Sequence, residues 1–225
     1  MNANNKSNSL HTEGSLHYLV REAKTGTNNP PLLMLMHGVG SNEQDMFAFA
    51  EHLPDNFLII SARGPLSMGP NSFSWFQVDF STGISVINSE QAEKSRKIII
   101  QFIESLKEHH LFDDKKIYLG GFSQGAIMSY SVGLTTPDLI KGIVVMSGRL
   151  LKEVRPFIAS AEKLKSLEVF ISHGISDNVL NIEYAREAYA YLKTHGLNPT
   201  YKEYEGSHSI SNETFQDMIQ WLKSR

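Results

Sequence analysis

The residues Gly121-Phe122-Ser123-Gln124-Gly125 place a serine between two glycines, directly after the apolar segment "KKIYLGG". This is the G-x-S-x-G spacing, in which a serine occupies a sharp turn between a strand and a helix and exposes its hydroxyl. The segment "GAIMSYSVGL" follows and has the character of a helix. A chance match is the alternative in a chain with 16 glycines. Partner residues must therefore decide whether Ser123 is a nucleophile.

A serine hydroxyl becomes a good nucleophile only when a histidine takes its proton and a carboxylate orients that histidine. On one common α/β scaffold these residues follow in the order Ser, Asp, His. Asp177 lies in "HGISDNV", just after the apolar segment "LEVFISHG", whereas Asp138 has the context of a turn and Asp217 lies within the last predicted helix. Asp177 is the predicted acid, because open α/β sheets place their sites at the carboxyl ends of strands.

His208 is the predicted base. It lies in "YEGSHSISNE", between the last predicted strand and the last predicted helix, where it can reach the same edge of the sheet as Ser123. His195 belongs to a helix end, and His173 closes a strand and is expected to help shape the turn that holds Asp177. The alternative for His208 is an ordinary surface histidine. Three placements that agree favour a Ser123-Asp177-His208 triad.

Acyl transfer also needs hydrogen-bond donors for the negative oxygen of the tetrahedral intermediate. The backbone N–H of Gln124 is one expected donor, and the loop His37-Gly38-Val39-Gly40 supplies the other, with Val39 as the expected contributor. His37 is expected to support this loop by hydrogen bonds rather than to act as a base or metal ligand.

These residues must be positioned by a sheet. Apolar segments of strand length, several without a polar residue, are typical of parallel strands buried on both faces; they occur near residues 15–22, 32–37, 57–61, 115–120, 142–147, 167–173 and 199–205. Amphipathic helical patterns lie between them, for example Ile99, Phe102, Ile103 and Leu106. The alternation predicts a three-layer α/β fold with a mostly parallel sheet of about seven strands. Only about twenty residues separate the fifth and sixth strands, too few for a large cap domain.

The segment 62–85 interrupts this alternation with turn-forming residues and many aromatics. A loop of this length in a compact domain is usually functional or disordered, and its aromatic content argues against disorder. We predict that Met68, Trp75 and Phe76 form a wall of a substrate pocket. The alternative is a loop folded over its own small apolar cluster.

Composition narrows the classes of function. A formal net charge of −3 with 20% charged residues is unlike a nucleic-acid-binding protein, and the absence of cysteine excludes disulfides and thiolate metal sites. We expect no metal and no cofactor. Residues 1–14 are polar and lack a signal-peptide pattern, and no apolar segment is long enough to span a bilayer. We predict a disordered tail over residues 1–14, one domain over residues 15–225, and a cytoplasmic protein without stable membrane insertion.

Several motifs together resemble the phospholipase/carboxylesterase family, small serine hydrolases that include the acyl-protein thioesterases. The motifs are "LMHGVGSNEQDM", "ARGP", "SWF", "GGFSQGA", "SHGISDNVL" and "GSHSI", in that order from about residue 32 to the C-terminus. The resemblance implies an α/β-hydrolase fold and hydrolysis of carboxylic esters, with Ser123, Asp177 and His208 as the triad and Val39 and Gln124 as oxyanion donors. Gly206-Ser207-His208 and Leu180 depart from the usual family pattern and leave the shape of the acyl pocket open.

The sequence therefore predicts a serine carboxylesterase that acts on small-molecule or lipid-like esters through an acyl-enzyme. Acyl-protein thioesterase or lysophospholipase activity is the first alternative. A peptidase or acyltransferase on the same triad is another, because fold and triad alone do not set the acceptor. A catalytically silent binding protein would be expected to lack a triad residue, and the oligomeric state is left open.

Overall fold

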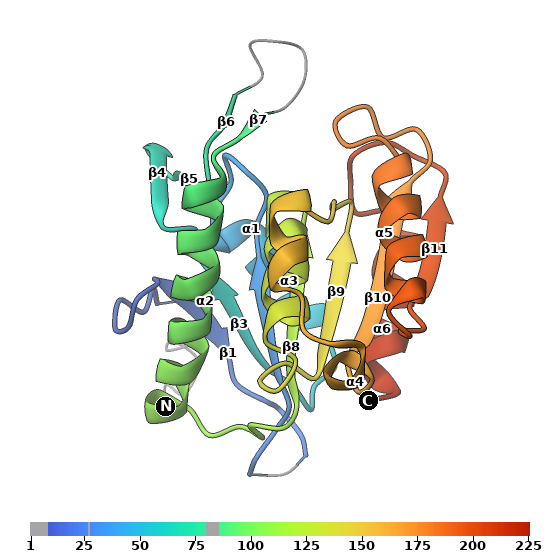
Figure 1. Ribbon diagram of the computed structural model, residues 1–225. Helices are drawn as coiled ribbons and strands as arrows, with labels where there is room; N and C mark the ends of the chain where they lie inside the picture. The colour runs from blue at the N-terminus through green and yellow to red at the C-terminus, as the bar shows by residue number, and fades with distance from the viewer. Residues whose placement is uncertain (1–8, 27, 80–85) are drawn as a thin grey trace, which may run out of the picture.

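The computed structural model describes residues 9–26, 28–79 and 86–225. Its centre is a seven-stranded sheet in the order β1-β3-β2-β8-β9-β10-β11 (Figure 1). These strands are β1 (Tyr18–Arg21), β2 (Leu32–Met36), β3 (Leu58–Ala62), β8 (Ile117–Phe122), β9 (Gly142–Met146), β10 (Glu168–Gly174) and β11 (Thr200–Tyr204). Only β1 runs antiparallel to its neighbour in this sheet. The prediction of seven strands in a mostly parallel sheet is confirmed, each within a few residues of its expected place.

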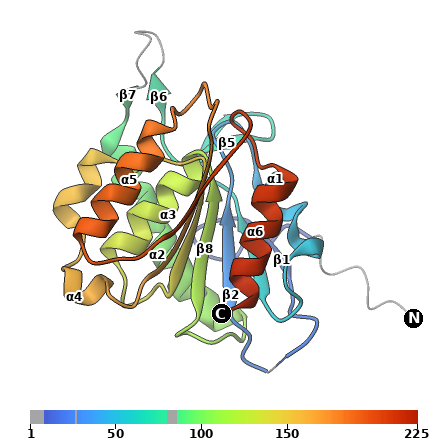
Figure 2. The same cartoon turned by 90° about the vertical axis from the view of Figure 1, so that its right-hand side faces the viewer.

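Helices cover both faces of this sheet. The helices are α1 (Glu43–Phe47), α2 (Ser89–His109), α3 (Gln124–Thr135), α4 (Ala161–Leu164), α5 (Glu183–Thr194) and α6 (Asn212–Lys223), with 3-10 turns η1 (Ala50–His52) and η2 (Lys152–Phe157). Figures 1 and 2 show α2, α3 and α5 on one face and α1 and α6 on the other. The chain therefore folds as the predicted three-layer α/β sandwich.

The sequence builds these layers because strand residues alternate between two cores. Met34 of β2 packs into the cluster beneath α2, α3 and α5, whereas its neighbours Leu33 and Leu35 pack into the cluster beneath α1 and α6. The apolar stripes of α2 and α6 are buried in these two clusters, respectively. Side chains on both faces of the sheet are thus buried, which explains why the strand segments carry almost no polar side chains.

The segment between β9 and β10 contains only η2 and α4, so no large cap covers the sheet, as predicted. The carboxyl ends of the parallel strands meet at the upper edge of Figure 1. There the strand order changes direction, since the chain passes from β2 outward to β3 and later returns to β8 on the other side of β2. Open α/β sheets bind ligands at such a point.

Two regions differ from a simple reading of the sequence. Residues 1–8 of the predicted tail lie outside the described residues, but His11 within it exchanges backbone hydrogen bonds with Tyr18. The segment 62–85 contains a hairpin of β4 (Leu66–Gly69) and β5 (Ser72–Ser74), followed by β6 (Val78–Asp79), which pairs with β7 (Val86–Ile87). Phe80 and the rest of residues 80–85 lie outside the described residues. Within the described ranges, no helix is long and apolar enough to cross a membrane.

Candidate active site

Ser123 occupies the sharp turn between β8 and α3. Its backbone has a φ of +53°, a left-handed conformation that is strained for a residue with a side chain, and its N–H donates to the carbonyl of Met146. A Cβ on Gly121 would collide with the backbone of Gly125, and one on Gly125 would collide with the carbonyl of Met36. Both glycines of the motif are therefore required by close backbone approach, and the turn holds the serine hydroxyl at the upper edge of the sheet.

A continuous chain of hydrogen bonds links Ser123, His208 and Asp177. His208 Nε2 lies 2.8 Å from Ser123 Oγ, and His208 Nδ1 lies 2.7 Å from Asp177 Oδ2. In the tautomer that carries its hydrogen on Nδ1, His208 donates to the carboxylate and leaves Nε2 free to accept the serine proton. The ring of Phe122 packs on the imidazole with 4.9 Å between centroids. The fold thus brings the three predicted residues together in an arrangement that can activate a hydroxyl.

Asp177 is held in one orientation by three hydrogen-bond donors, and His173 lies close to it. Its Oδ1 accepts the backbone N–H groups of Val179 and Leu180, at 2.9 and 2.8 Å. Its Oδ2 faces both His208 and, at 3.2 Å, His173 Nε2. The loop after β10 therefore folds around the carboxylate itself, because the backbone N–H groups of Val179 and Leu180 donate to it.

The loop after β2 carries Val39, whose backbone N–H the sequence predicts as the second oxyanion donor. His37 is fully buried; its Nδ1 lies 2.7 Å from the carbonyl of Gly38, and its Nε2 accepts the N–H of Gly64 at 2.9 Å. These contacts define a neutral imidazole, and burial lowers the pKa of His37. Within the described residues, the N–H groups of Val39 and Gln124 donate to no protein acceptor. His37 thus supports the loop, and two backbone donors remain available for a ligand.

The side chain of Gln124 makes a further connection that the sequence did not predict. Its Oε1 accepts the N–H of Trp75 at 2.7 Å, and its Nε2 donates to the carbonyl of Phe76 at 2.6 Å. The indole N–H of Trp75 in turn donates to the carbonyl of His37 at 3.0 Å. Trp75 therefore ties the nucleophile turn to the loop that carries Val39.

Two cavities meet at Ser123. A groove of about 620 Å³ is lined by Ser123, His208 and, on its apolar side, Phe49, Phe122 and Ile210. On the other side of the serine, a small cavity of about 40 Å³ is lined by Ser123 and Gln124 together with Phe76, Ile127, Leu180 and other residues. Val39 and Val179 border both cavities. The site is open at the surface, as expected for a domain without a cap.

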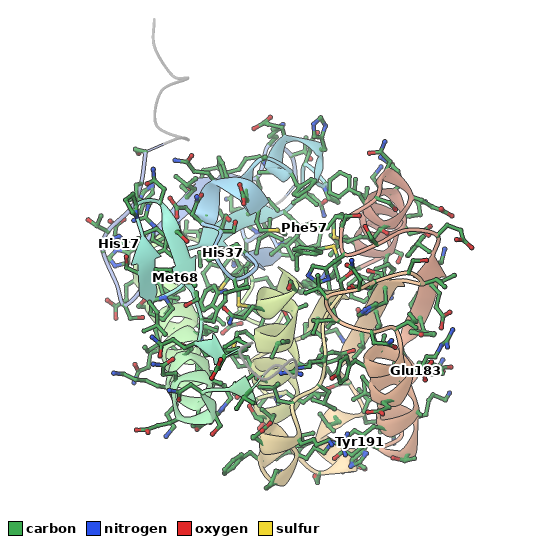
Figure 3. The ribbon with its side chains drawn as sticks, turned by 90° about the horizontal axis from the view of Figure 1, so that it is seen from above. His17, His37, Phe57, Met68, Glu183 and Tyr191 are labelled. Carbon is green, nitrogen blue, oxygen red and sulfur yellow. The ribbon has the colours of Figure 1, made fainter. Side chains whose placement is uncertain are left out.

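The three predicted pocket residues lie in different places. Phe76 is buried and lines the small cavity beside Ser123. Trp75 is also buried but lines neither cavity, because it packs behind the loop after β2. Met68 is 55% exposed on the β4–β5 hairpin, and Figure 3 shows it with His37 on the side of the molecule away from Tyr191. Of the described residues in segment 62–85, Phe76 and Val78 thus line the cavity beside Ser123, whereas Met68 and Trp75 do not.

Several cavity residues were not identified from the sequence. Phe49 and Ile210 line the groove, and Arg149 lines the small cavity. For Arg149 a signal was present, since it follows a strand that ends at the same edge of the sheet as Ser123. Phe49 gave no comparable signal, because it lies between two short helical turns.

Across the described ranges, no group of three or more histidine, aspartate or glutamate residues is arranged to hold a metal ion. The chemistry that these residues can perform is proton transfer between Ser123 and His208, with backbone N–H groups facing a developing negative charge.

Comparison with known proteins gives the same picture. Residues 21–225 match the phospholipase/carboxylesterase family. The chain is 29% identical over 219 residues to acyl-protein thioesterase 1 of Kluyveromyces lactis, which covers 90% of this chain and 95% of the relative. A carboxylesterase structure from Mesorhizobium loti superposes with a TM-score of 0.82 at 19% identity, covering 96% of this chain and 99% of that one. A Bacillus cereus carboxylesterase gives 0.80 at 22% identity, covering 93% and 94%. These two structures establish the α/β-hydrolase fold.

Proposed function

The chain belongs to the phospholipase/carboxylesterase family, and from this premise we propose that it is a serine carboxylesterase that works through an acyl-enzyme. The observation that carries the proposal is the pair of contacts of His208, 2.8 Å to Ser123 Oγ and 2.7 Å to Asp177 Oδ2. An ordinary surface histidine is not expected to bridge a strained serine and a buried carboxylate through its two ring nitrogens.

The first half of the reaction forms the acyl-enzyme. Ser123 Oγ attacks the ester carbonyl carbon while His208 Nε2 takes the hydroxyl proton, and Asp177 stabilises the imidazolium. The carbonyl oxygen becomes negative and accepts the N–H groups of Val39 and Gln124. When the intermediate collapses, the bond to the leaving alcohol breaks and His208 returns the proton to that oxygen or sulfur.

The second half repeats these steps with water. His208 takes a proton from a water molecule, whose oxygen attacks the acyl carbon, and the bond to Ser123 Oγ breaks as the serine regains its proton. The products are a carboxylic acid and the alcohol or thiol. No co-reactant other than water is required.

The two cavities suggest how an ester lies in the site. The leaving oxygen must receive its proton from His208, and His208 lines the groove but not the small cavity. The alcohol or thiol portion therefore occupies the groove, and the acyl portion enters the small cavity. A volume of about 40 Å³ leaves room for only a short acyl chain, whereas about 620 Å³ accepts a bulky leaving group.

Reaction with a fluorophosphonate probe, followed by a panel of esters and thioesters, tests this function. We expect labelling of Ser123 and hydrolysis of short-chain acyl esters. Faster turnover of acylated peptide thioesters than of simple esters would shift the assignment to the activity named for the Kluyveromyces lactis relative. Cleavage of amides in preference to esters would indicate a peptidase. Failure of both labelling and hydrolysis would refute the proposal in favour of a silent binding protein.

A further inference from the structure

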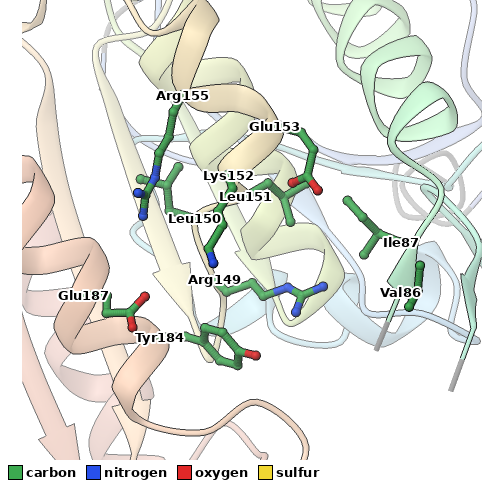
Figure 4. A pocket seen from close by; sticks show the side chains of 10 residues that line it. All are labelled: Val86, Ile87, Arg149, Leu150, Leu151, Lys152, Glu153, Arg155, Tyr184 and Glu187. Carbon is green, nitrogen blue, oxygen red and sulfur yellow. The ribbon is translucent and has the colours of Figure 1, made fainter. Parts of the chain in front are cut away.

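Arg149 lines both the small acyl cavity and a second, wider cavity beside it. The small cavity contains both Ser123 and Arg149 in its lining. Arg149 and Ile87 also line the neighbouring cavity of about 330 Å³, drawn in Figure 4. The wall of the cavity that begins at Ser123 therefore includes a guanidinium group.

Arg149 is positioned by the short turn that follows strand β9. Strand β9 ends at Met146, beside the nucleophile turn, and Ser147 follows with a φ of +50°. A Cβ on Gly148 would come within 2.6 Å of the side chain of Ala126 in α3, so this segment passes close to the helix that begins at Ser123. The chain is thus turned toward the acyl cavity immediately before Arg149.

The arginine side chain is supported on one side by an aromatic ring. Its guanidinium carbon lies 5.4 Å from the centroid of Tyr184 in α5. Figure 4 shows the side chain extending between Tyr184 and Ile87. The ring contact holds the guanidinium at the cavity wall, and the group keeps its charge at every accessible pH.

Among the described residues that line the small cavity, only Arg149 carries a charged side chain. The other described lining residues are Val39, Phe76, Val78, Ile87, Ser123, Gln124, Ile127, Val179 and Leu180. The acidic residues Glu153 and Glu187 line the wider cavity but not the small one. A neutral acyl chain would gain nothing from a cation in the wall of an apolar cavity, whereas a carboxylate would pair with it in surroundings of low dielectric.

We propose that Arg149 determines specificity for acyl groups that carry a negative charge at their far end, so that the substrates are monoesters or monothioesters of short dicarboxylic acids. This inference rests on the proposed function. Ser123 attacks the esterified carbonyl of such a substrate, and the free carboxylate reaches Arg149. Water completes the hydrolysis, and the products are the dicarboxylic acid and the alcohol or thiol.

Matched substrates isolate the charge. Phenyl monoesters of succinic, glutaric and adipic acid are compared with the esters in which a carboxamide replaces the free carboxylate, and the Ser123→Ala protein supplies the background rate. The measured quantity is the ratio of kcat/KM for the carboxylate over kcat/KM for the carboxamide. For the wild-type protein we expect a ratio of at least about tenfold at one chain length, the size of one charge-assisted hydrogen bond.

Variants assign this ratio to Arg149. Arg149→Met keeps an unbranched apolar side chain without the guanidinium and should bring the ratio close to one, and Arg149→Lys should retain part of it. Arg155→Met is the matched control, because Arg155 lines the wider cavity but not the one that contains Ser123. The ratio should be unchanged in that variant.

Two results would overturn the inference: a wild-type ratio of one or less at every chain length, or an Arg149→Met protein that keeps the wild-type ratio. If the carboxamide esters are hydrolysed and Ser123 is labelled by the fluorophosphonate, such a result refutes the role of Arg149 alone. If neither labelling nor hydrolysis occurs, the proposed function itself is wrong.

Discussion

His173 Nε2 lies 3.2 Å from Asp177 Oδ2, and both side chains are shielded from solvent. The same nitrogen lies 2.7 Å from the carbonyl of Leu180. One imidazole N–H therefore connects the end of β10 to the far side of the loop that carries the acid. Desolvation lowers the pKa of His173, so the ring is neutral, and its Nε2–H donates to the carbonyl of Leu180.

The first prediction concerns this positioning role. His173→Leu should lower kcat about tenfold with little change in KM, because the carbonyl of Leu180 loses its donor and the loop whose N–H groups orient Asp177 toward His208 is loosened. His173→Gln restores an N–H donor and should recover part of the loss. Steady-state kinetics are compared at temperatures well below the melting temperature of each variant. Equal losses in the two variants would indicate that His173 contributes only by packing.

The second prediction concerns the nucleophile. Ser123→Ala should reduce ester hydrolysis by about 10⁴-fold or more and abolish fluorophosphonate labelling, because it removes the attacking oxygen. Ser147→Ala is the matched control, since Ser147 is also a buried serine with positive φ at the end of the adjacent strand. That variant should still be labelled. Residual activity near the wild-type level in Ser123→Ala would contradict the assignment.

The elements that position these residues were predictable because each has a strong local signal. Strand segments such as Leu32–Met36 are wholly apolar, and α2 repeats its buried residues at helical spacing. The proximity of Ser123, Asp177 and His208 followed from a topological rule, since each comes after a strand that ends at the same edge of the sheet. Their catalytic roles stay predictions until the variants are measured.

Contacts between distant segments were not predictable. Nothing near Gln124 in the sequence indicates that its amide holds the backbone of Trp75 and Phe76, 49 and 48 residues away, respectively. The sequence also predicts the same pocket role for Trp75 and Phe76. In the structure these adjacent residues differ, because Phe76 lines the small cavity and Trp75 packs against the loop after β2. The two-residue strands β6 and β7 are too short to produce a periodic pattern.

The third prediction concerns stability and pH. Burial lowers the pKa of both His37 and His173 below the ordinary value of about 6.5, which the unfolded chain retains. Below about pH 6.5 the unfolded state therefore binds more protons than the folded state, and the free energy of unfolding falls. The slope is at most about 1.4 kcal/mol per pH unit for each histidine.

Urea denaturation at pH 7.5, 6.5 and 5.5 measures this effect above the range in which most carboxylates titrate. The His173→Gln protein should show a smaller decrease between pH 6.5 and 5.5 than the wild type, because one of the two histidines is gone. An unfolding free energy that stays constant from pH 7.5 to 5.5 would contradict the neutral, buried state of both rings.

The last prediction separates Phe76 from Trp75. Phe76 lines the small acyl cavity, so Phe76→Leu should enlarge it and raise kcat/KM for longer acyl chains relative to shorter ones by several-fold, given roughly 0.8 kcal/mol for each buried methylene. Trp75→Phe removes the indole N–H that donates to the carbonyl of His37. It should lower kcat/KM by a similar factor for every chain length, because the loop that carries Val39 is loosened rather than the cavity reshaped. A series of linear acyl esters, measured with melting curves, distinguishes these outcomes. A change in chain-length preference in Trp75→Phe, with none in Phe76→Leu, would show that Trp75 is the pocket wall and that the small cavity does not hold the acyl chain.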